Sequence, residues 1–249
     1  MAGKFESAYQ RIGWATEQMG ELKRRSHVYF NPDTHPRFTE TDPKTSHTLD
    51  KIKLKPIPNP IIRNVVQIIE GLRSALDHAA NATVPRGKKA YFPFGDTRRD
   101  MKASFGSDRY KHLPKDIRTL FVKFKPYKAG NSTLWALNKM CNMTKHRKML
   151  APSISIKDTV FEDRWGVGAY DALPFAPSWD RRKNEIIVSR SLGKGTVHHD
   201  VEFSIGIQFG KVPVLSGRPV PSNLGKMAGI VLSIVRATEA EARRLGIIK

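Results

Sequence analysis

The chain has 249 residues, and its 43 Lys and Arg against 23 Asp and Glu give a net charge of +20 beside 39% hydrophobic residues. This length can bury a core in one large domain or two small ones, and the hydrophobic content excludes a disordered chain. The charge disfavours cationic partners and favours nucleic acid or another anionic surface. The single Cys141 excludes an internal disulfide and a cysteine-rich zinc site.

The start of the chain and its hydropathy bear on where the protein resides. The opening MAGKFESAYQRIGW has no apolar core of signal-peptide length. No run approaches the about 20 apolar residues that a membrane helix needs. We therefore expect a soluble, basic, cytoplasmic protein that does not enter a membrane.

Apolar residues recur at helical spacing in the first part of the chain. They predict helices over about 5–25, 59–83, 114–127 and 131–148, with a polar loop over 31–48 and a short strand over 49–56. The second of these helices has clear ends, because Asn59 and Pro60 suit its first turn and Pro85 stops it.

From about residue 151 the pattern changes to the period of two that is typical of strands. Predicted strands cover 153–161, 184–192, 201–209 and 211–215, and a last helix covers about 222–245. The sequence therefore predicts an α+β fold: a helical bundle of three or four helices, a mainly antiparallel β-sheet and a C-terminal helix. Residues 1–150 would form the helical part and 151–249 the strand-rich part, as two domains or as layers of one.

The helix over 59–83 carries a cation, a carboxylate and an imidazole within two turns. Arg73 projects about 100° to one side of Leu72, and His78 projects about 120° to the other. Asp77 follows Arg73 by four residues, which is the spacing of an ion pair. The group is either a solvated helix face with one ion pair or the wall of a site.

The helix over 131–148 has a polar row beside its apolar stripe. Asn138, Asn142 and His146 follow one another at spacings of four, and Lys145 and Arg147 flank the histidine. Buried amides need partners, so the row is either a structural hydrogen-bond network or a site wall. The cations at its end could bind a phosphate and offer an acid or base near neutral pH, or they could simply complement the helix dipole.

Between Arg86 and Lys128 there are 13 Lys and Arg against 4 Asp and Glu. The cations that we expect to contact a nucleic-acid backbone are Lys88, Lys89, Arg98, Arg99, Lys145 and Arg147. The interspersed aromatic residues are Tyr91, Phe92, Tyr110 and Tyr127. This mixture suits attraction to phosphates together with base stacking, and solvated loop charge is the alternative.

Other kinds of site find little support in the sequence. The glycines at 193 and 195 lack the earlier glycine spacing of a phosphate loop. His198 and His199 would point to opposite faces of a strand, which argues against metal chelation. We expect no metal and no cofactor.

The segment from Arg73 to His78 resembles the R-x4-6-H motif of the HEPN superfamily, small helical domains that include many metal-independent ribonucleases. The pair LRSALDH and LNKMCNMTKHR is also similar to a group of uncharacterised bacterial and phage proteins, over roughly residues 58–150. The resemblance implies that His78 acts as general acid or base at the ribose 2′-hydroxyl or the leaving oxygen. Arg73 would stabilise the phosphorane, and His146 would supply the complementary proton transfer.

Together these patterns predict a basic RNA-binding protein and, through the resemblance, a metal-independent endoribonuclease of a bacterial or phage defence or toxin system. The alternative is a non-catalytic nucleic-acid-binding or assembly protein, in which Asp77, Asn138 and Asn142 form a structural polar network. The expected partner is RNA or another nucleic acid. A second copy of the chain and a neutralising acidic partner are further candidates.

Overall fold

A computed structural model describes residues 3–143, 150–156, 178–180, 182–192 and 203–248. The chain forms two compact units, each made of separate stretches. The first comprises Met1–Arg25, Asn59–Ala151 and Ile207–Lys249, and the second comprises Ser26–Pro58 and Pro152–Gly206. These units do not follow the division near residue 150 at which the sequence pattern changes. The last helix belongs to the first unit, and an early pair of strands belongs to the second.

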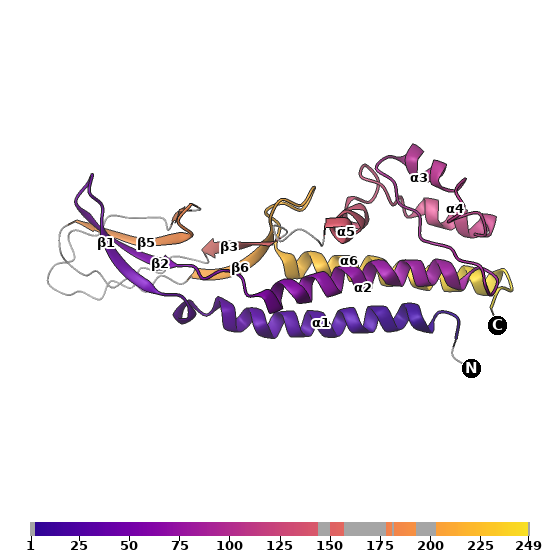
Figure 1. The fold of residues 1–249 in the computed structure, drawn as a ribbon, viewed down its shortest axis with the longest axis horizontal. Coiled ribbons are helices and arrows are strands. Elements are labelled where there is room, and N and C mark those ends of the chain that lie inside the picture. Colours follow the sequence, from indigo (N-terminus) through magenta and orange to yellow (C-terminus); the bar gives the residue numbers. More distant parts are fainter. Residues whose placement is uncertain (1–2, 144–149, 157–177, 181, 193–202, 249) are drawn as a thin grey trace. The chain divides into compact units, whose positions relative to one another are not determined.

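Three long helices dominate the first unit and run side by side (Figure 1). They are α1 (Glu6–Phe30, whose last residues enter the second unit), α2 (Asn59–Ala82) and α6 (Val220–Arg244). The apolar stripe of α2 is fully buried at Val65, Ile68 and Leu72, and the helix packs against α6. These helices match the predicted ranges, and the C-terminal helix is confirmed.

Three shorter helices complete the helical part: α3 (Arg98–Ser104), α4 (Lys115–Lys123) and α5 (Ser132–Met143). Helix α4 ends at Lys123, earlier than the predicted 127, because Lys125 has a positive φ of 52°. Helix α5 matches the start of the predicted range 131–148, whose last residues lie outside the described ones, and it packs against α2 and α6. Helix α3 was not predicted. Its start is fixed by a capping box in which Thr97 and Asp100 bond each other's backbone N–H, and that Thr-x-x-Asp pattern is the sequence signal for it.

A four-stranded sheet forms in the second unit, in the order β1-β2-β5-β4. Its strands are β1 (Arg37–Thr41), β2 (His47–Lys53), β5 (Glu185–Leu192) and β4 (Ser178–Asp180), and each neighbouring pair is antiparallel. A separate two-stranded sheet pairs β3 (Leu150–Ile156) with β6 (Phe203–Phe209). The predicted α+β class with a mainly antiparallel sheet is confirmed.

Two predictions about the strands are wrong. The polar loop expected over 31–48 contains β1 and the start of β2; β1 is an edge strand whose residues are mostly exposed, so no apolar alternation marks it. The strand expected over 211–215 is a turn, in which Val214 has a positive φ of 60°. Gly217 N–H donates to the Phe209 carbonyl at 2.8 Å and closes this turn after β6.

The two faces of the four-stranded sheet differ in chemistry. One face carries Ile52, Leu54, Ile186 and Val188, and Phe30 packs against them. Because side chains alternate along a strand, the neighbouring Lys51, Lys53 and Glu185 lie on the other face.

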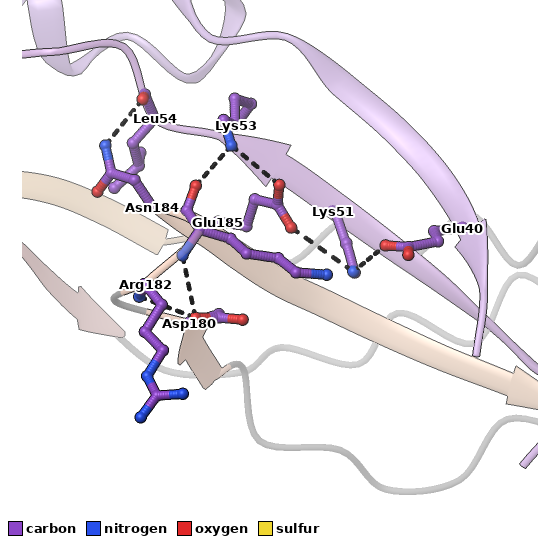
Figure 2. A network of polar contacts seen from close by, with 9 residues as sticks. Glu40, Lys51, Lys53, Leu54, Asp180, Arg182, Asn184 and Glu185 are labelled. Carbon is purple, nitrogen blue, oxygen red and sulfur yellow. Dashed lines mark hydrogen bonds and ion pairs between the residues drawn. The ribbon is translucent and has the colours of Figure 1, made fainter. Parts of the chain in front are cut away.

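Figure 2 shows that opposite face as a network of ion pairs. Lys51 pairs with Glu40, and its Nζ lies 3.6 Å from Glu185 Oε2, while Lys53 Nζ lies 3.0 Å from Glu185 Oε1. The Lys51 side chain is only 6% exposed, so it depends on both carboxylates for compensation of its charge. The hydrogen bond from Lys51 and its charge lower the pKa of Glu40.

Candidate functional site

The loop that follows α2 docks along that helix through two side chains. Asp77 Oδ1 accepts a hydrogen bond from Phe92 N–H at 2.9 Å, and Asn81 Oδ1 accepts one from Ala90 N–H at 3.2 Å. Alternate residues of an extended chain are about 6.7 Å apart, and residues four apart on a helix rise about 6 Å. The two spacings match. Asp77 and Asn81, about one turn apart on α2, therefore bind alternate residues of the loop and fix its register.

Arg73 continues the same row of α2 and is engaged on three sides. Its Nη1 lies 2.6 Å from Asp77 Oδ1, an ion pair without the alignment of a hydrogen bond. Its Nε donates to Asn138 Oδ1 of α5 at 3.1 Å, and its guanidinium carbon lies 4.5 Å from the centre of the Phe94 ring. Arg73 therefore joins α2, α5 and the docked loop, with its side chain 17% exposed.

The loop sequence Tyr91-Phe92-Pro93-Phe94-Gly95 is largely a packing element. The Phe92 ring is fully buried, at 5.1 Å from the Phe94 ring and 4.7 Å from the Phe121 ring. A Cβ on Gly95 would lie 2.4 Å from Met101 N and 2.8 Å from Thr97 O, closer than any real contact. Gly95 therefore allows the loop to pass against the first turn of α3.

We expect Gly95→Ala to lower the free energy of unfolding by about 1–3 kcal/mol, because overpacking against backbone cannot be relieved by a rotamer change. Urea unfolding followed by circular dichroism measures the difference. Gly225→Ala on the exposed face of α6 is the matched control; a Cβ there meets nothing within 4 Å, so alanine should stabilise that helix. Equal stability of Gly95→Ala and the wild type would show that the loop moves freely away from α3.

A pocket of about 330 Å³ lies between α2 and the docked loop; we call it the α2 pocket. His78 lines it on the flank of α2 away from Arg73, and its Nδ1 lies 3.0 Å from Ser7 Oγ of α1. Arg109 lies over the Tyr91 ring at the rim, with 5.8 Å from its guanidinium carbon to the ring centre. The residues that line the pocket are Ser74, Asp77, His78, Asn81, Lys89, Ala90 and Tyr91.

The α2 pocket combines an imidazole, a carboxylate, an ammonium group and an aromatic ring. The ammonium group favours an anionic ligand, the ring offers a stacking surface, and the imidazole has the chemistry of a general acid or base. Such a group of side chains can bind a nucleotide unit, and it can transfer protons if a reacting atom lies beside His78.

The structure brings only some of the predicted site residues together. Arg73 contacts both Asp77 and Asn138, while Asn142 is exposed on α5. His78 lies in the α2 pocket with Lys89. The exposed cations Lys88, Arg98 and Arg99 do not line that pocket, and Lys145, His146 and Arg147 lie outside the described residues.

Sequence reasoning missed four residues of this region: Ser7, Ser74, Asn81 and Arg109. Asn81 follows Asp77 by four residues, so the spacing rule that paired Arg73 with Asp77 would also have found it. Ser7 and Arg109 come from other segments, and no spacing along α2 points to them.

A second polar cluster ties the loop to α5. Asp96 Oδ1 accepts a hydrogen bond from Trp135 Nε1 at 2.9 Å and lies 2.7 Å from Lys139 Nζ. The hydrogen bond from Lys139, and after it the one from Trp135, lower the pKa of Asp96. Lys128 and Lys139 place their ammonium groups 5.7 and 5.3 Å from the Trp135 ring. These cations are therefore engaged within the fold.

Within the ranges that the structure covers, no group of three or more His, Cys, Asp or Glu side chains is arranged to hold a metal ion. Burial raises the pKa of the Cys141 thiol, which disfavours a nucleophilic thiolate. None of the described helices combines the length and hydropathy of a membrane span. Comparison with known protein families, curated proteins and solved structures finds no match to this chain.

Proposed function

We propose that this protein binds RNA or another nucleic acid through the exposed cations of residues 86–128. Lys88, Lys89, Arg98 and Arg99 are all exposed, and none of them pairs with an acidic side chain of the described residues. Unpaired exposed cations attract phosphates and release the counterions that surround them. This observation carries the proposal.

The four acidic residues of the same segment are engaged elsewhere. Asp100 caps α3, and the other three lie close to different cations. Their partners are Lys139 for Asp96 at 2.7 Å, Lys111 for Asp108 at 2.8 Å and Arg244 for Asp116 at 3.8 Å. The positive charge of Lys88, Lys89, Arg98 and Arg99 is therefore not compensated locally.

We expect Arg98→Gln/Arg99→Gln to weaken binding to single-stranded RNA and to reduce the slope of log affinity against log salt by about one or two. Fluorescence anisotropy at several salt concentrations measures both. Lys23→Gln/Lys226→Gln is the matched control, since it removes two exposed cations of α1 and α6. If the wild-type protein had no affinity for any polyanion at low salt, the proposal would be overturned. Equal losses of affinity in both double variants would show that nucleic acid does not bind specifically at Arg98 and Arg99.

A metal-independent endoribonuclease of a bacterial or phage defence or toxin system is the second candidate. His78 favours it, because its imidazole lines the α2 pocket beside Lys89. The resemblance to the HEPN motif implies that Arg73 stabilises the phosphorane. The Arg73 side chain, however, already contacts Asp77, Asn138 and Phe94. In this candidate, charge stabilisation at the phosphate therefore falls to Lys89 rather than to Arg73.

A further inference from the structure

Tyr91 differs from the other aromatic residues of its loop. Its side chain is 37% exposed, whereas the adjacent Phe92 is 0% exposed. Ala90 and Phe92 are buried and donate their backbone N–H groups to α2, whereas Tyr91 between them is exposed and lines the α2 pocket. An exposed ring beside Lys89 and Arg109 has the composition of a base-stacking platform.

The polar groups of the α2 pocket are arranged for a ligand with both a charged and a hydrogen-bonding part. Lys89 and Arg109 supply positive charge next to Tyr91. Asp77 and Asn81 each use one oxygen for the loop backbone. Asp77 is also paired with Arg73, but neither Asp77 Oδ2 nor Asn81 Nδ2 makes a hydrogen bond among the described residues, so an acceptor and a donor remain for the edge of a base.

We propose that the α2 pocket binds one nucleotide of a single-stranded nucleic acid, with its base stacked on Tyr91 and its phosphate at Lys89. The inference rests on the proposed function, because the exposed cations of residues 86–128 would bring the strand to the pocket. A volume of about 330 Å³ is near the lower end for small-molecule pockets, which suits a single nucleotide. A base paired in a duplex cannot reach such a ring, so the strand must be single.

The test compares two labelled strands of equal length by fluorescence anisotropy: a single-stranded RNA and an abasic strand with the same phosphates. We expect the wild type to bind the RNA about ten-fold more tightly, the effect of one stacked base. Tyr91→Ala should remove this difference and Tyr91→Phe should keep it, with affinity for the abasic strand unchanged in both. Trp14→Ala is the matched control, because Trp14 is 49% exposed with Arg11 at 5.2 Å from its ring.

The outcomes separate the pocket from the general attraction of the cations. Equal affinity of the wild type for both strands overturns the nucleotide site and leaves nucleic-acid binding intact. A preference for RNA that survives Tyr91→Ala, or that Trp14→Ala removes, means that bases bind elsewhere and also overturns the site. Absence of binding to either strand overturns both proposals. Thermal melting of each variant verifies that it is folded.

Discussion

Arg73→Ala is expected to lower the free energy of unfolding by about 2–4 kcal/mol, because it removes three contacts at once. The variant loses the ion pair with Asp77, the hydrogen bond to Asn138 and the contact with the Phe94 ring. It also leaves the partly buried Asp77 carboxylate with the Phe92 N–H but without its cation. The docked loop and α5 should both loosen from α2.

Urea unfolding of Arg73→Ala measures this loss, and two variants calibrate it. Arg73→Lys keeps the charge but not the planar fork, so we expect an intermediate stability. Arg63→Ala removes an exposed arginine of the same helix and should change stability by no more than about 0.5 kcal/mol. If Arg73→Ala were as stable as Arg63→Ala, the three contacts would be weak, and Arg73 would be available for the role that the HEPN-like motif assigns to it.

The sequence predicted one of the three Arg73 contacts. The pair with Asp77 follows from spacing along a single helix, and it is present at 2.6 Å. Asn138 lies 65 residues further along the chain, on another helix. Periodicity defines which positions share a face of one helix, but it carries no information on which faces of two helices meet. The polar row of residues 138, 142 and 146 could therefore be described, but its partners on other segments could not be predicted.

The same limit explains which elements of the fold could be predicted from the sequence. Long amphipathic helices such as α2 and α6 were predictable because packing of an apolar stripe dominates their stability. Strand β1 was not, because an edge strand with exposed side chains needs no apolar pattern. Its pairing with β2, and the pairing of β2 with β5 over 130 residues later, define a unit from two distant stretches that no local pattern joins.

If the protein is an endoribonuclease, His78→Ala is expected to slow RNA cleavage by about 10²–10⁴-fold, the effect of removing a general acid or base. His78 lines the α2 pocket, and its Nδ1 is oriented by Ser7 Oγ at 3.0 Å. RNA binding should stay nearly intact, because the exposed cations of residues 86–128 supply most of the attraction. Ser7→Ala should reduce the rate less than His78→Ala, since it disturbs only the orientation of the ring.

Cleavage of a mixed RNA pool in EDTA, with detection of 2′,3′-cyclic phosphate ends, measures the effect. His27→Ala, at an exposed position of α1, is the matched control and should cleave like the wild type. Arg73→Ala belongs in the same assay, corrected for its folded fraction: a rate that recovers after the correction assigns Arg73 to structure, and one that does not supports a catalytic role. Undiminished cleavage by His78→Ala would exclude the imidazole from the reaction. Absence of cleavage by every form, with RNA binding retained, would favour the non-catalytic binding protein.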